Sequence, residues 1–181
     1  MPARDELRVS LGSTRPWCWL GLALTAAGAL ELLGGALLIR ALVGPPWSTA
    51  LETVLAVATL ALLVVLWSPL WGSLRVSGDH LVVDFGLVAG LCARLDEIES
   101  VEPFRPDALH PVPLGVDVDP ELARATLSRG AGDGYLLIRA SAPQPMRHQV
   151  CSRANVRTAV VRVADPAWAA EVLTMSLRQG G

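Results

Sequence analysis

Two apolar stretches, at about residues 17–43 and 48–71, are each long enough to cross a membrane. A helix rises about 1.5 Å per residue, so roughly 20 apolar residues cover the hydrocarbon layer of about 30 Å. The first stretch contains Glu31 and Arg40 as its only charged residues, and the second contains only Glu52. Core helices of soluble domains are shorter and less continuously apolar, so the sequence predicts two transmembrane helices.

Tryptophan marks the ends of both stretches. Trp17 and Trp19 open the first, Trp47 lies in the connection, and Trp67 and Trp71 close the second. Indole rings favour the headgroup layer, so these residues are expected to form interfacial belts. The connection at residues 44–47 is too short for anything but a tight turn. The region 17–72 is therefore predicted to be an antiparallel helical hairpin.

Arginine residues set the predicted orientation. Arg4, Arg8 and Arg15 precede the first span and Arg75 follows the second, whereas the opposite side has only Arg40. The positive-inside rule then makes residues 1–16 and the region after residue 72 cytoplasmic. The absence of lysine and the richness in Ala and Leu favour a bacterial origin, and hence the inner membrane. A cleaved signal peptide is the competing interpretation, but the first stretch is longer than a usual signal sequence and contains Glu31.

The first span carries a face suited to helix packing. Gly21, Gly28 and Gly35 recur every seven residues, and Glu31 lies on the same face. Small residues let helices approach closely in lipid, and polar side chains join them. Glu31 is predicted to be either a structural contact between helices or a functional carboxyl group. The functional alternatives are a proton- or ion-linked switch and a binding point for the helix of another membrane subunit. As a structural contact, Glu31 could reach Thr25, Thr59 or Glu31 of a second copy.

Glu52 has a simpler structural interpretation. With Thr49 it fits a motif in which two side chains cap the backbone at a helix start. Arg40 lies at a similar depth on the other helix and is an alternative partner for Glu52.

After residue 72 the hydrophobic pattern changes to the alternation that is typical of strands. Strands are predicted at 74–77, 80–85, 87–95, 98–102, 135–140, 149–153 and 156–163. A proline-rich insertion at 103–120 divides them, and the run Asp119-Pro120-Glu121 predicts a helix to Leu127. A second helix, from Asp165 to about Leu177, is expected to cover the sheet with Trp168, Val172 and Met175.

Three segments carry a resemblance to a known family: "LRVSGDHLVVDFGLVAG", "ARLDEIESVE" and "VVRVADPAWAAEVL". Placed after a hairpin, they resemble the bacterial two-span membrane proteins that carry a pleckstrin-homology-like (PH-like) domain. The resemblance covers most of the chain. It implies an α+β protein with a bent antiparallel sandwich or barrel of about seven strands, closed by a C-terminal helix and used as a scaffold. The chain departs from the family in the 103–120 insertion and in lacking a basic cluster in the first hairpin.

The sequence shows no catalytic, metal or cofactor motif. The histidines (His80, His110, His148) and cysteines (Cys18, Cys92, Cys151) are widely spaced, and phosphate-binding loops are absent. The cysteines are expected to be small buried residues. The protein is therefore predicted to be non-enzymatic, with no cofactor.

Charge is uneven along the predicted domain. Residues 73–130 contain five arginines and ten acids, whereas residues 131–181 contain six arginines and three acids. Candidates for contact with lipid headgroups or a partner are Arg147, His148, Arg153, Arg157 and Arg162. Each residue near an anionic surface contributes about 1 kcal/mol, although these side chains could instead pair with the acidic half or be solvated. A net charge of −2 argues against nucleic-acid binding.

Together these features predict a small inner-membrane protein whose PH-like domain binds a membrane or cytoplasmic protein partner, or lipid headgroups. The alternative is an accessory subunit of a larger membrane complex or transport system, assembled through the hairpin. A homo-oligomer is also possible, because two spans can enclose a transport path only if several copies assemble.

Overall fold

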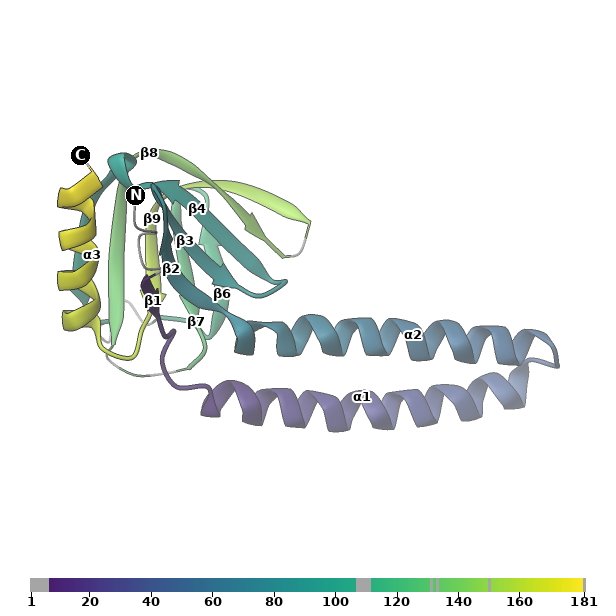
Figure 1. Ribbon diagram of the computed structural model, residues 1–181. Coiled ribbons are helices and arrows are strands. Elements are labelled where there is room, and N and C mark those ends of the chain that lie inside the picture. Colours follow the sequence, from purple (N-terminus) through teal and green to yellow (C-terminus); the bar gives the residue numbers. More distant parts are fainter. Residues whose placement is uncertain (1–6, 107–111, 131, 133, 150, 181) are drawn as a thin grey trace.

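The computed structural model describes residues 7–106, 112–130, 132, 134–149 and 151–180. A helical hairpin projects from one side of a β-domain (Figure 1). Helix α1 spans Arg15–Leu42, and helix α2 spans Trp47–Trp67 and continues into the short turn η1, Ser68–Trp71. Both helices are long and apolar enough to cross a membrane, and they coincide with the two predicted apolar stretches.

The described part of the domain contains nine strands in one mixed sheet. They are β1 (Leu7–Val9), β2 (Ser73–Ser77), β3 (His80–Phe85), β4 (Ala89–Arg94), β5 (Ile98–Phe104), β6 (Gly115–Asp119), β7 (Arg124–Ser128), β8 (Tyr135–His148) and β9 (Ser152–Arg162). Their order is β1-β2-β3-β4-β8-β9-β7-β6, and β5 pairs with β8. The predicted α+β layout is present, but the sheet has more strands than the expected seven. It is also not wholly antiparallel, because β7 and β9 run parallel.

Strand β8 is shared between two neighbours on one of its edges. Residues 135–140 pair with β5, whereas residues 146–148 pair with β4. Strand β9 follows the other edge, with a shift of register between Arg139 and Gln144. The strands bend at this shift, so the tip of the β8–β9 hairpin projects in the same direction as α1 and α2 (Figure 1).

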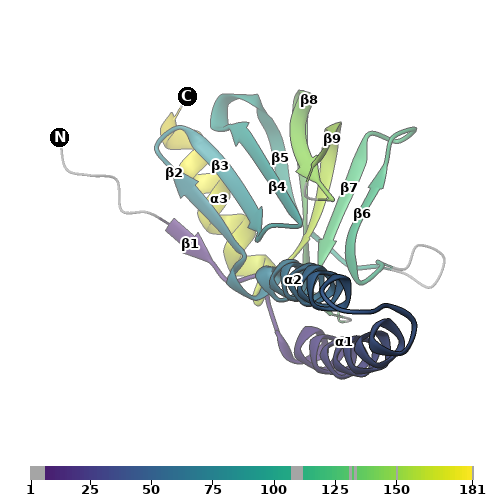
Figure 2. The same ribbon diagram turned by 90° about the vertical axis from the view of Figure 1, so that its right-hand side faces the viewer.

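The core lies between the curved sheet and helix α3, Pro166–Gly180. Alternation along β3 is typical, because Leu81, Val83 and Phe85 are buried while His80 is exposed. Burying one such side chain stabilises the fold by about 2 kcal/mol. Helix α3 lies on the side of the domain away from the hairpin (Figures 1 and 2).

The predicted helix beginning at Asp165 is present, but its predicted buried face is wrong. The Asp165 carboxylate accepts a hydrogen bond from the Trp168 backbone at 3.0 Å and caps the helix. The buried side chains are Ala169, Ala170 and Leu173, whereas Trp168 and Met175 are 46% and 48% exposed. Small alanines allow the close approach to β5 that a tryptophan would prevent.

The helix predicted from Asp119 to Leu127 is also wrong, because this segment forms the β6–β7 hairpin. Asp119 Oδ1 accepts bonds from the backbone of Glu121 (3.0 Å) and Leu122 (3.1 Å), which close a turn instead of a helix. Pairing of β7 with β9 then outweighs the local preference of Leu122–Leu127 for a helix. Strand β6 lies within the proline-rich insertion, of which residues 107–111, including His110, fall outside the described residues. Arg4 also falls outside them.

Two smaller predictions are wrong. Helix α2 already begins at Trp47, so Thr49 lies within its first turn and does not cap it with Glu52. Glu52 instead pairs with Arg40, with Nε–Oε1 and Nη2–Oε2 distances of 2.7 and 2.9 Å. Cys92 and Cys151 are exposed instead of buried, because Cys92 lies on the outer face of β4 and Cys151 lies in the β8–β9 turn.

Candidate functional site

Trp17 joins the start of α1 to both the end of α2 and the domain core. Its indole Nε1 donates to the Leu66 carbonyl at 2.9 Å, and its ring meets Phe85 edge-on with centroids 5.9 Å apart. Trp17 is only 7% exposed, so it is not the belt residue that its position predicts. The side chains of Trp19, Trp71 and, at the opposite end, Trp47 are highly exposed and remain suited to the headgroup layers.

The β3–β4 turn is seated on the end of α2. Ser68 Oγ accepts a bond from the Leu87 backbone at 2.9 Å and donates to the Val65 carbonyl at 2.7 Å. Gly86 has a φ of +66°, and a Cβ there would lie 2.2 Å from the Ser68 carbonyl oxygen. Only glycine fits so close to the backbone of Ser68. The turn is therefore held against Ser68, the residue that follows Trp67 at the end of α2.

Arg129 makes the third connection and lies at the end of β7. Its guanidinium Nη1 donates to the carbonyls of Pro69 and Leu70, each at 3.2 Å, and Nη2 donates to the Gly12 carbonyl at 3.5 Å. The side chain is buried, and this burial, followed by the nearby charge of Arg162, lowers its pKa. The helix end presents carbonyl groups with partial negative charge, which a cation stabilises. Arg129 therefore fixes the domain to the end of the hairpin.

Arg147 joins the β8–β9 hairpin to the β3–β4 turn. Its Nη1 donates to the Leu87 carbonyl at 2.7 Å and its Nη2 to the Gly86 carbonyl at 3.0 Å. Because the same turn rests on Ser68, the level of Arg147 relative to the end of α2 is fixed. Arg153 is the cross-strand partner of Arg147, so both side chains lie on one face of the sheet.

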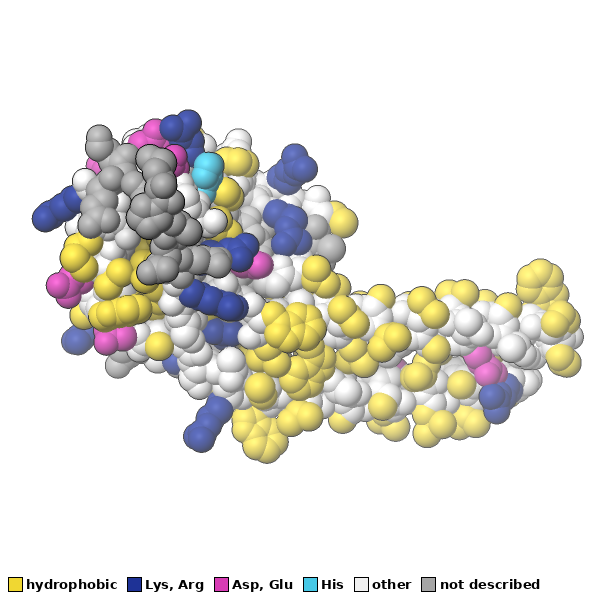
Figure 3. All heavy atoms as spheres, viewed as in Figure 1, with side chains coloured by type: hydrophobic (Ala, Val, Ile, Leu, Met, Phe, Trp, Pro, Cys, Tyr) yellow, Lys and Arg dark blue, Asp and Glu magenta, His cyan; other side chains and the backbone are white. Residues whose placement is uncertain are grey.

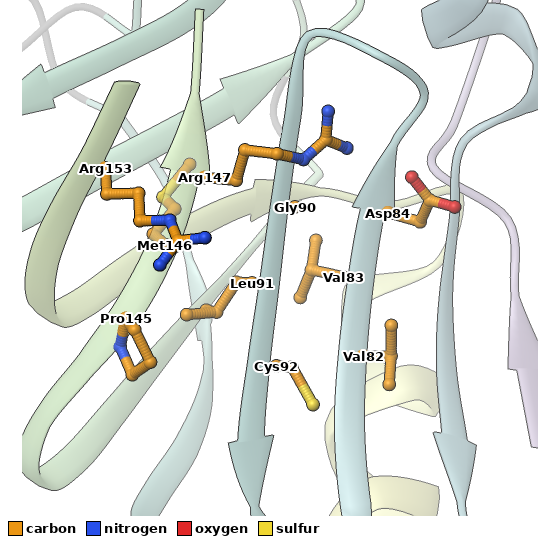
Figure 4. Close-up of a pocket in the computed structure, with 10 residues that line it drawn as sticks. All are labelled: Val82, Val83, Asp84, Gly90, Leu91, Cys92, Pro145, Met146, Arg147 and Arg153. Atoms are coloured by element: carbon orange, nitrogen blue, oxygen red, sulfur yellow. The ribbon is translucent and has the colours of Figure 1, made fainter. Parts of the chain in front are cut away.

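The two arginines line a hollow on that face, here called the arginine groove, of about 370 Å³ (Figure 4). Its wall and floor also contain Val82, Val83, Asp84, Gly90, Leu91, Cys92, Pro145 and Met146. The hollow exists because the side chains at Gly90 and Cys92 are small and leave it unfilled. Arg153 is exposed, and it forms no ion pair with the residues that the structure describes. The groove thus combines a basic rim, one carboxylate and an apolar floor.

The five predicted contact residues do not form one cluster. Arg147 and Arg153 share the groove, while His148 follows Arg147 on the strand and so points to the opposite face. Arg157 is exposed further along β9, outside the groove. Arg162 lies at the other end of β9, against Gly12, Gly130 and Gly132. Leu87, which is 44% exposed beside the groove, was not among the predicted contact residues. Its one signal in the sequence is that an apolar residue follows Gly86 in a turn.

The three glycines of the predicted packing face, Gly21, Gly28 and Gly35, lie against α2. A Cβ at Gly21 would lie 3.0 Å from the Trp67 ring, one at Gly28 3.6 Å from Thr59 Cγ2, and one at Gly35 2.8 Å from Leu55 Cδ2. Glu31 differs, because its side chain is exposed and lines a second hollow between the helices. Figure 3 shows hydrophobic side chains along the whole length of the hairpin, with charged side chains near its far end. Within the described residues, no hydrogen bond or ion pair involves the Glu31 carboxyl group.

The residues that the structure describes contain no group of three or more His, Cys, Asp or Glu side chains placed to hold a metal ion. Comparison with protein-family models, with curated proteins and with solved structures finds no match for this chain.

Proposed function

We propose that this chain is a non-enzymatic bacterial inner-membrane protein whose PH-like domain binds anionic lipid headgroups beside its own hairpin. The observation that carries this function is the position of Arg147. Its bonds to Gly86 and Leu87, and the bond of Leu87 to Ser68, hold a guanidinium group at the level where α2 ends. If α2 spans the bilayer, that level is the headgroup layer.

The chemistry of the groove suits a phosphate group. Guanidinium groups bind phosphate with paired, charge-assisted hydrogen bonds, and Arg153 is exposed with its donors available. The exposed Leu87 beside the groove can insert between headgroups, as apolar side chains at membrane surfaces do. Two arginines at about 1 kcal/mol each favour an anionic lipid over a neutral one by about thirtyfold.

Charge also supports an orientation with the domain and both termini in the cytoplasm. Arg8 and Arg15 lie on the domain side of the hairpin, together with the arginines of the domain. On the far side, Arg40 is neutralised by its ion pair with Glu52. The imbalance agrees with the positive-inside rule.

A thiol in the groove provides the test. In the full chain carrying Cys18→Ala and Cys151→Ser, Cys92 is the remaining thiol, and it lines the arginine groove. Its alkylation by an uncharged, water-soluble maleimide is measured in nanodiscs of phosphatidylcholine alone and in nanodiscs that also contain phosphatidylglycerol. A lipid headgroup in the groove slows alkylation in the anionic discs.

Arg153→Gln and Arg157→Gln form a matched pair on the same strand. Arg153→Gln is expected to abolish the difference between the two kinds of disc, whereas Arg157→Gln, outside the groove, keeps it. Slowing that persists in Arg153→Gln reflects the general surface charge and contradicts headgroup binding in the groove. Equal rates in both discs for the unsubstituted groove contradict it as well.

A further inference from the structure

Two polar side chains near the middle of the hairpin lack hydrogen-bond partners among the described residues. Glu31 lies about 24 Å along α1 from Arg15 and about 16 Å from Leu42, so it is well inside a bilayer. Thr59, on α2, makes no bond to the backbone one turn earlier. In contrast, Thr25 donates to the Gly21 carbonyl at 2.7 Å and Thr53 to the Thr49 carbonyl at 2.8 Å.

Both unpaired side chains open into the same hollow between the helices, here called the hairpin groove. It measures about 340 Å³ and is lined by Leu24, Ala27, Gly28 and Glu31 of α1 and by Ala58, Thr59, Leu62, Leu63 and Leu66 of α2. The small side chains at its centre allow another helix to approach closely. Polar side chains at this depth are costly without a hydrogen-bond partner, and another helix in the groove can supply the bonds that Glu31 and Thr59 lack.

The hairpin groove is complementary to itself. A threonine hydroxyl donates and accepts a hydrogen bond, and a carboxyl group accepts in either protonation state. In a symmetric pair of copies inserted in the same orientation, residues at the same depth meet, and α1 of one copy faces α2 of the other. Each unpaired carboxyl group can then face an unpaired hydroxyl group, and neither copy needs a basic residue from a different protein.

We propose that two copies of this chain pair through the hairpin groove, with Glu31 of each copy hydrogen bonded to Thr59 of the other. The two hairpins then form a four-helix bundle in the membrane. This pairing is independent of headgroup binding, because the arginine groove lies on the domain and the hairpin groove lies between the spans.

The test counts copies of the full-length, fluorescently labelled chain in liposomes by single-molecule photobleaching, over a range of protein-to-lipid ratios. The unsubstituted chain is expected to show two bleaching steps at ratios where chance co-occupancy gives one. Glu31→Leu is expected to weaken the pair at least tenfold. Thr59→Val, which removes the hydroxyl group at nearly constant volume, weakens it to a smaller extent.

A second pair of variants keeps the test decisive if the loss of Glu31 disturbs folding. Ala27 and Ala29 are both exposed on α1, but only Ala27 lines the hairpin groove. Ala27→Leu fills the groove and is expected to produce monomers, whereas Ala29→Leu, about 200° further round the helix, keeps the dimer.

Three results overturn the pairing. One is a monomeric unsubstituted chain at every ratio. Another is a dimer that survives both Glu31→Leu and Ala27→Leu. The third is a chain that is monomeric alone but is crosslinked through the groove to a different membrane protein in native membranes, which assigns the groove to a heterologous partner.

Discussion

The two ends of the hairpin are held in different ways. At the near end, where the hairpin joins the domain, Trp17, Ser68 and Arg129 make hydrogen bonds to buried or partly buried backbone groups. At the far end, one exposed ion pair between Arg40 and Glu52 links the helices. Buried backbone carbonyls need their donors, whereas exposed ion pairs exchange with water at little cost. The near end therefore sets the position of the hairpin relative to the domain, and the far end only closes the turn.

Loss of Arg129 is expected to break the near end most severely. Arg129→Leu leaves the carbonyls of Pro69 and Leu70 without their donor and lowers the free energy of unfolding by about 4 kcal/mol. Denaturant unfolding of the full chain in detergent micelles measures the loss. Arg157→Leu, at an exposed arginine, is the control and is expected to change stability little. Equal losses in the two variants would contradict the role of Arg129.

Gly86 allows the β3–β4 turn to lie against the end of α2. Gly86→Ala is expected to cost about 3 kcal/mol, because it adds a contact with the Ser68 carbonyl to the strain of a positive φ. Gly78 has a φ of +59°, and no atom lies within 4 Å of the position that an added methyl group would take. Gly78→Ala therefore carries the strain alone, about 1 kcal/mol. Thermal unfolding of both variants separates the two contributions, and a Gly86→Ala chain as stable as Gly78→Ala would show that the turn is not seated on α2.

The far end is expected to give the smallest effect. Arg40→Gln removes the ion pair, yet the side chains face solvent or headgroups and regain polar contacts there. The expected result is an unchanged thermal midpoint in micelles at physiological salt. A large shift in the midpoint would show that the far end contributes as much to stability as the near end.

Much of the architecture could be predicted from local patterns. Apolar length identifies both helices, and alternation identifies β3 because its core residues are two apart. Strand β8 is harder to predict, because Pro143 and Pro145 argue against a strand, yet the chain stays extended through them with only a shift of register. Strand β7 is also hard to predict, because it pairs with β9, whose residues lie more than thirty positions later in the sequence.

The candidate site was less accessible to sequence reasoning. The excess of arginine after residue 131 is a local signal, and it identifies Arg147 and Arg153. The role of Arg129 is not local, because the carbonyl groups it binds lie 59 and 60 residues earlier. Nor does the sequence separate Arg157 and Arg162 from the pair in the groove, because this depends on the register of β9 against β8 and β7.

The short strand β1 links the two ends of the helical hairpin by pairing with β2. Residues Leu7–Val9 pair with Leu74–Val76 on the other side of both helices, so the two spans together form the loop of a single β-hairpin. In the proposed membrane arrangement, that ladder can close only when both flanks of the loop emerge on the same side of the bilayer. A chain inserted with one span, or with its first span reversed, cannot complete the edge of the sheet. In the proposed arrangement, folding of the domain therefore depends on the correct insertion of both helices.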